Sequence, residues 1–153
     1  MNYEQESRRL TEAAAHTPPE ALANHWAREE ENLLDDRPFA AYMRRKLREK
    51  GILQQQVFLA ADLSENYGYK LISQEKHTRS RDVVLRLCVA AGLSPAETQE
   101  ALTLYGTAPL HGRIRRDTVF LSALGSGMRD VYAVDELLRR HGLRPLMRAE
   151  EDF

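Results

Sequence analysis

The sequence is poor in features that many enzymes and membrane proteins require. Cys88 is the only cysteine among 153 residues, which excludes an intramolecular disulfide and any site built from several thiolates. No apolar run approaches the roughly 20 residues that a membrane-spanning helix needs. The opening residues, MNYEQESRRL, lack the apolar core of a signal peptide. We therefore expect a soluble protein of the reducing cytoplasm, with no membrane partner.

Motifs for catalysis and metal binding are also missing. The histidines, at positions 16, 25, 77, 111 and 141, are scattered, and there is no HExxH, GxSxG or phosphate-binding loop. Cys88 lies beside Leu85 and Leu87 on an apolar stripe, which favours a buried structural thiol over a nucleophile. The segment GSGMRD follows no strand, so a helix connector is the better interpretation. We expect no enzyme, no metal and no cofactor.

The charges that are present are unevenly distributed. The formal net charge is −1, but residues 1–37 hold four basic and nine acidic side chains, residues 38–93 hold ten and five, and residues 94–153 hold eight and nine. The middle of the chain is therefore +5. Such an excess indicates a polyanion as partner, although solvated helix faces would give the same count.

Apolar residues recur at spacings of three and four, and alternating β-branched runs are scarce, so the sequence predicts an all-α protein. One helix is expected over 3–15. A second, capped by Thr17 and opened by Pro18 and Pro19, should run through Leu22, Trp26 and Leu33. A third should begin at Pro38 and end at Gly51.

Start signals divide the rest of the chain into further helices. Two short helices, over 53–62 and 63–74, meet at a tight corner where Ser64 can cap the second. Ser80 is expected to cap a helix that ends at Gly92. Ser94, with Pro95 and Glu97 after it, is the clearest start signal in the chain. Two more helices are expected at about 113–124 and 131–142.

Three features of the two short helices form a pattern: Gln54, Val57 and Phe58 on the first, the corner Ala61-Asp62-Leu63-Ser64, and the helix that follows. Together with the order of the segments, this pattern resembles the helix-turn-helix domain of Cro and the phage repressors, the Xre family. The segments YGYKLIS, SRD, GLSPAETQEAL and RIRRDTVFLSAL are similar to a clostridial-type subset. In that subset an acidic helical leader precedes the five-helix domain and two extra helices follow it.

The resemblance implies a domain plan. Residues 1–37 would be the acidic helical leader, 38–106 the helix-turn-helix domain, 107–148 a C-terminal helical extension packed on it, and 149–153 a disordered tail. The leader could dock against the basic module and compete with a polyanion. For the extension, dimerisation and simple capping of the core stay open.

The resemblance also implies a DNA site, with helix 64–73 in the major groove of double-stranded DNA. Its base-facing residues would be Ser64, Glu65, Asn66, Tyr67 and Lys70, with Asn66 suited to adenine and Glu65 to cytosine. Gln54 would reach phosphate, and the loop residues Lys76, Arg79 and Arg81 would add salt-dependent backbone contacts.

Several positions depart from the repressor pattern. Leu53 replaces the usual capping Ser or Thr, and Asp62 and Gln74 replace common glycines. Phe58 stands where a small residue is usual and Gly68 where a β-branched one is usual, at positions that touch where the two helices cross. This inversion of sizes conserves volume. It predicts that the Phe58 ring lies over Gly68.

Two functions follow from these expectations. The first is a DNA-binding transcriptional regulator that needs no cofactor, and a homodimer would match half-sites about 34 Å apart. The alternative is a helix-turn-helix scaffold that binds a protein partner and little or no DNA, which would suit Glu65 and the near-neutral total charge.

Overall fold

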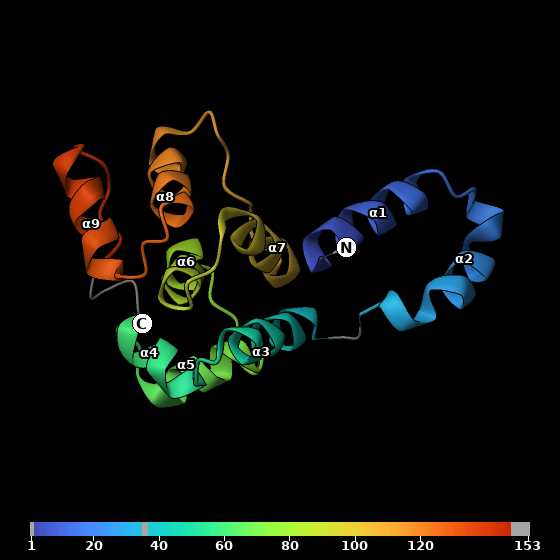
Figure 1. Cartoon of the computed structure of the whole chain (residues 1–153), viewed down its shortest axis with the longest axis horizontal. Helices are drawn as coiled ribbons and strands as arrows, with labels where there is room; N and C mark the ends of the chain where they lie inside the picture. The colour runs from blue at the N-terminus through green and yellow to red at the C-terminus, as the bar shows by residue number, and fades with distance from the viewer. Residues whose placement is uncertain (1, 35–36, 148–153) are drawn as a thin grey trace. The chain divides into compact units, whose positions relative to one another are not determined.

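The computed structural model describes residues 2–34 and 37–147, and over them the chain forms helices α1 to α9 and no strand (Figure 1). The prediction of an all-α protein is confirmed. None of the described helices is both long and apolar enough to cross a membrane. The chain divides into two compact units, Met1–Asp36 and Arg37–Phe153.

The first unit contains α1 (Tyr3–Ala15) and α2 (Leu22–Glu29). Short 3₁₀ helices at Pro19–Ala21 and Glu30–Asn32 flank α2. Asn2 and Gln5 cap α1 reciprocally, with hydrogen bonds of 2.8 and 3.1 Å. The Arg9 guanidinium lies 3.1 Å from the Glu29 carboxylate and ties α1 to α2. The two helices thus form an acidic pair stabilised by polar contacts rather than by a large apolar core.

Two expectations for the first unit are wrong. The Thr17 hydroxyl does not cap the second helix, because it donates 2.7 Å back to the Ala13 carbonyl at the end of α1. The second helix is also interrupted: α2 is only eight residues long, and Trp26 on it is 54% exposed. The helix expected to continue through Trp26 to Leu33 therefore ends at Glu29, and its tryptophan faces solvent.

The second unit is built around α6 (Arg81–Ala90), in which every residue from Asp82 to Ala90 is buried. Figure 1 shows α6 in the middle of this unit. It packs against α4 (Gln54–Ala60), α7 (Pro95–Tyr105) and α9 (Val131–Arg140). A helix that is buried on all sides, and whose buried residues are mostly apolar, needs such surroundings because each of its faces must be removed from water.

The remaining helices cover this core. They are α3 (Pro38–Lys50), α5 (Glu65–Ile72) and α8 (Arg115–Gly125). α3 packs on α5 and α7, and α8 packs on α7 and α9. The buried Lys46 ammonium reaches the Glu97 carboxylate at 3.2 Å and ties α3 to α7. The segment expected as an extension therefore belongs to the same compact unit as residues 38–106, whereas the expected tail 149–153 lies outside the described residues.

The caps in the second unit agree with the sequence at Gly51, Ser64 and Ser94 and differ at Ser80. Gly51 ends α3 in the left-handed conformation, with φ +66°, and Ser94 and Glu97 form a capping box at α7. Ser80 precedes α6, but its side chain makes no capping hydrogen bond. Instead the Thr78 hydroxyl oxygen accepts from the Ser80 amide at 3.1 Å.

Candidate nucleic-acid interface

α5 is a short helix with one buried and one exposed face. The Ser64 hydroxyl oxygen accepts from the Tyr67 amide at 3.2 Å and caps its start. Gly68, Leu71 and Ile72 are buried. Ser64, Glu65 and Asn66 are exposed, whereas Tyr67 and Lys70 are partly buried. Of the five residues expected to face bases, three are therefore exposed to solvent and two are only partly exposed.

The buried face of α5 is fitted to Phe58 of α4. A Cβ atom added at Gly68 would lie 2.4 Å from Cδ1 of Phe58, and the Phe58 side chain is only 1% exposed. This is the contact that the inverted sizes predict. The Phe58 ring also meets the Tyr69 ring edge-on, with centroids 4.9 Å apart and planes at 76°. Tyr69 is 40% exposed, so the contact fixes an aromatic residue on the outer surface of α5.

Contacts from the buried side fix the corner between α4 and α5. Asp62 takes φ +58°, in the left-handed region that aspartate tolerates better than most residues. Arg86 of α6, fully buried, donates to the carbonyls of Ala61 at 3.0 Å and Asp62 at 2.8 Å. From α9, Tyr132 approaches Asp62, and burial together with this carboxylate raises the pKa of the tyrosine. The start of α5 is therefore fixed by α6 as well as by α4.

The loop after α5 is also held in one conformation. Gln74 has φ +64°, and its side-chain oxygen accepts from the Ala40 amide at 3.1 Å. The Tyr105 hydroxyl accepts from the Thr78 amide at 2.7 Å. His77 stacks on the Tyr105 ring, with centroids 4.6 Å apart and planes at 14°. These contacts leave Lys76 and Arg79 exposed on either side of an anchored segment.

Arg81 has a different environment from the other basic residues of the loop. Its guanidinium forms two contacts with the Asp117 carboxylate, at 2.5 and 3.2 Å, and donates 3.2 Å to the Pro109 carbonyl. Asp117 is fully buried. Arg81 thus joins α6 to α8, and it is engaged within the protein rather than available at the surface.

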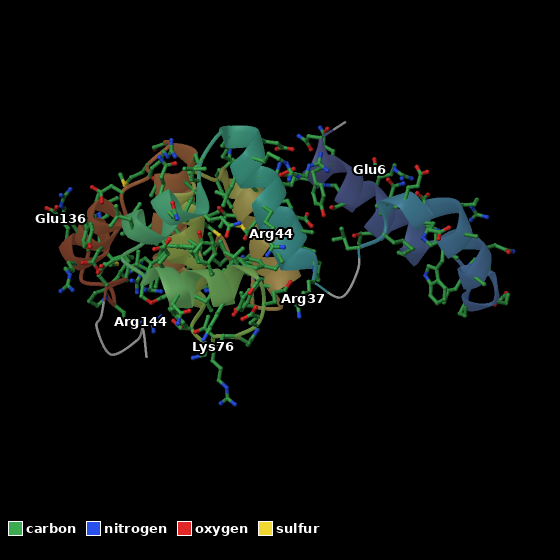
Figure 2. All side chains as sticks on the ribbon, turned by 90° about the horizontal axis from the view of Figure 1, so that it is seen from below. Glu6, Arg37, Arg44, Lys76, Glu136 and Arg144 are labelled. Atoms are coloured by element: carbon green, nitrogen blue, oxygen red, sulfur yellow. The ribbon has the colours of Figure 1, made fainter. Side chains whose placement is uncertain are left out.

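Several basic side chains of the second unit have no hydrogen bond or ion pair within residues 37–147. They are Arg44, Arg48, Lys70, Lys76, Arg79, Arg113, Arg115 and Arg129. The first five belong to α3, to α5 and to the loop after it. In Figure 2, Arg44 lies over α3 and Lys76 lies at the lower edge of the unit. Basic groups without a protein partner therefore concentrate around α5.

A groove beside α5 brings in residues that the sequence did not single out for this site. It has a volume of about 550 Å³, and its polar lining includes Arg44, Arg48, Gln54, Gln55 and Tyr69. Gln54, expected to reach phosphate, is thus joined by two arginines of α3. Tyr69 could stack on bases or belong to the core on sequence grounds. It follows Glu65 by four residues and Asn66 by three, and it shares their exposed face.

Metal binding and thiol chemistry find little support in the described part of the chain. No group of three or more His, Cys, Asp or Glu side chains there is arranged to hold a metal ion. Cys88 is fully buried, and burial raises its pKa to about 12. A thiol with that pKa is protonated at neutral pH and is a poor nucleophile.

Comparison of the chain with models of protein families, with curated proteins and with solved structures finds no match. The function therefore has to be argued from the geometry and chemistry of the residues themselves.

Proposed function

We propose that the second unit is a helix-turn-helix module of the Xre type, that it binds double-stranded DNA, and that it regulates transcription. The observation that carries this proposal is the set of unpartnered basic side chains around α5, combined with an exposed polar face on α5 itself. Phosphate contacts need free cations, and base contacts need free polar side chains on a protruding helix.

The roles of individual residues follow from their places on this surface. Asn66, exposed on α5, can pair with the two hydrogen-bonding groups of adenine, and Glu65 can accept from cytosine. Tyr69 offers an apolar ring to a thymine methyl group. Lys76 and Arg79 on one flank of α5, with Arg44 and Arg48 in the groove on the other, supply phosphate contacts.

The anchored corner supports the same proposal. Base reading requires a helix held in a fixed position, because side chains that move freely lose discrimination between bases. Here Arg86 binds both corner carbonyls and Phe58 closes on Gly68, so α5 is fixed at its start and along its buried face.

A second candidate function is suggested by two apolar side chains, Leu53 immediately before α4 and Leu59 on it. Leu59 is 83% exposed and Leu53 is 65% exposed, and Leu53 borders the groove beside α5. Exposed leucines are common at protein interfaces and contribute little to phosphate binding. A protein partner that covers α4 and α5 is therefore the alternative to DNA.

The salt dependence of duplex binding tests the proposal. We expect a 30-base-pair duplex to be bound with an affinity that falls steeply between about 50 and 200 mM salt. Substituting Lys76 and Arg79 together by Gln should make the fall of log affinity with log salt less steep, reducing the absolute value of the slope by about two. The matched control substitutes Arg113 and Arg115 by Gln. It removes the same charge outside the α5 surface, which is the exposed face of α5 together with Arg44, Arg48, Lys70, Lys76 and Arg79, and it should leave the slope unchanged.

Two outcomes would contradict the proposal. One is the absence of duplex binding at low salt, which would favour the protein partner. The other is an equal loss in both double variants, which would mean that net charge alone attracts the duplex.

A further inference from the structure

A second groove lies between α8 and α9, formed by residues other than those of the α5 surface. Its volume is about 430 Å³, within the range of roughly 300–1,000 Å³ that small-molecule sites occupy. Val119 of α8, Leu137 of α9 and Leu143 line its apolar part. All three are partly buried rather than fully enclosed, so apolar surface stays accessible inside the groove.

The polar lining of the groove is basic and hydroxylic. Arg115 and His141 are exposed, and Thr118 and Ser122 complete this part, although the Thr118 hydroxyl already donates 2.6 Å to the Arg115 carbonyl. The guanidinium of Arg115 and the hydroxyl of Ser122 have no hydrogen bond within residues 37–147. No Asp or Glu is among the residues that line the groove. A ligand here would therefore meet donors and a positive charge next to an apolar wall.

We propose that this groove binds a small organic anion: a carboxylate that carries an apolar chain. The carboxylate would accept two hydrogen bonds from the planar guanidinium of Arg115, and the Ser122 hydroxyl and His141 ring would add donors. The apolar chain would lie on Val119, Leu137 and Leu143. A neutral apolar ligand would leave the arginine without a partner, and a purely ionic one would leave the apolar wall in water.

The proposal does not depend on DNA binding, because its residues and its test are separate from the α5 surface. Octanoate is the probe, titrated into the full chain and followed by amide and methyl NMR. We expect saturable shifts at Ser122, Val119, Leu137 and Leu143. Octanol, with the same chain and no charge, and acetate, with the charge and no chain, should each bind at least tenfold more weakly.

Variants assign the binding to the two parts of the groove. Arg115→Gln should weaken octanoate at least fivefold, whereas Arg113→Gln, which removes a nearby exposed arginine outside the lining, should leave its affinity unchanged. Ser122→Phe fills the groove from an exposed position and should abolish binding, with thermal melts to verify folding. Equal affinity for octanoate and octanol, equal effects of the two arginine variants, or binding retained in Ser122→Phe would each overturn the proposal.

Discussion

Gly68 has no room for a side chain, because any Cβ atom would overlap the buried ring of Phe58. Alanine would favour the helix by about 1 kcal/mol over glycine, which makes this glycine costly in isolation. The cost is offset because the ring occupies the space that a larger residue would fill. Helix propensity and packing therefore oppose each other at this residue, and packing decides.

We predict that Gly68→Ala lowers the free energy of unfolding by about 1–3 kcal/mol, the usual cost of overpacking a core. In a Phe58→Ala background, where the ring is absent, the same substitution should instead stabilise by about 1 kcal/mol. Urea unfolding of the four proteins measures this reversal of sign. Gly112→Ala is the control, since nothing lies within 4 Å of its Cβ position. A stabilising Gly68→Ala in the original background would contradict the packing explanation.

At the scale of helices, α6 and α8 are joined by two ion pairs at their starts. Arg81 binds Asp117, and Asp82 binds Arg116 through two contacts of 2.7 and 2.8 Å. Both aspartates are buried. The loop that carries Lys76 and Arg79 leads directly into α6. The two ion pairs between α6 and α8 therefore connect this loop to the C-terminal helices.

We predict that Arg116→Met lowers the free energy of unfolding by about 3 kcal/mol, because it removes the two close contacts to the buried Asp82 carboxylate and leaves only the half-exposed Arg144, 3.8 Å away. The double variant Asp82→Leu/Arg116→Met should be more stable than the single variant, since no buried charge is left over. Arg140→Met is the control. It breaks an ion pair with Glu136 whose side chains are 62% and 74% exposed, and should change stability by less than about 1 kcal/mol. Equal losses in the single and double variants would show that packing, not charge, decides.

Asp135 of α9 fixes the last described residues of the chain. Its carboxylate accepts from the amides of Leu146 and Met147 and from the Arg139 guanidinium, each at 2.8 Å. Burial alone would raise the pKa of Asp135, but the amide and guanidinium hydrogen bonds outweigh it and hold the pKa below its ordinary value.

A lowered folded-state pKa means that the unfolded chain binds the proton more readily, so this contribution to stability is present above about pH 4 and is lost as the pH falls further. Asp135→Asn should therefore be less stable than the original protein at about pH 6, and the two should converge as the pH falls below the ordinary pKa of an aspartate, about 3.9. Unfolding in denaturant across this range measures the difference. A difference independent of pH would assign the effect to the shape of the side chain rather than to its charge.

The sequence predicted best what depends on neighbours along the chain. The C-terminus of α3 at Gly51 and the N-terminus of α7 at Ser94 both follow from local capping patterns. Arg81 was expected at the surface because nothing near it in the sequence indicates a partner, yet Asp117 lies 36 residues away. The groove arginines Arg44 and Arg48 were missed for a similar reason. Their role depends on the way α3, α4 and α5 meet, and no local pattern encodes that.

At the scale of the whole molecule, the division into two units is also a division of charge. Residues 1–36 hold nine acidic and three basic side chains, a net charge of −6, and residues 37–153 hold fourteen acidic and nineteen basic ones, a net charge of +5. The core described above lies entirely in the second unit. An acidic segment joined to a basic unit is held at a high local concentration near that unit and can compete with phosphate for its cations.

We predict that a chain beginning at Arg37 folds with an unchanged melting temperature and binds duplex DNA at least threefold more tightly, because the competing negative charge is gone. Substituting Glu20, Glu30 and Glu31 together by Gln should give part of this gain. These carboxylates are exposed and have no ion pair within residues 2–34, so their removal separates charge from bulk. Fluorescence anisotropy at several salt concentrations measures both effects. An affinity and a salt slope that stay the same after removal of the leader would show that the acidic unit does not act on the DNA surface.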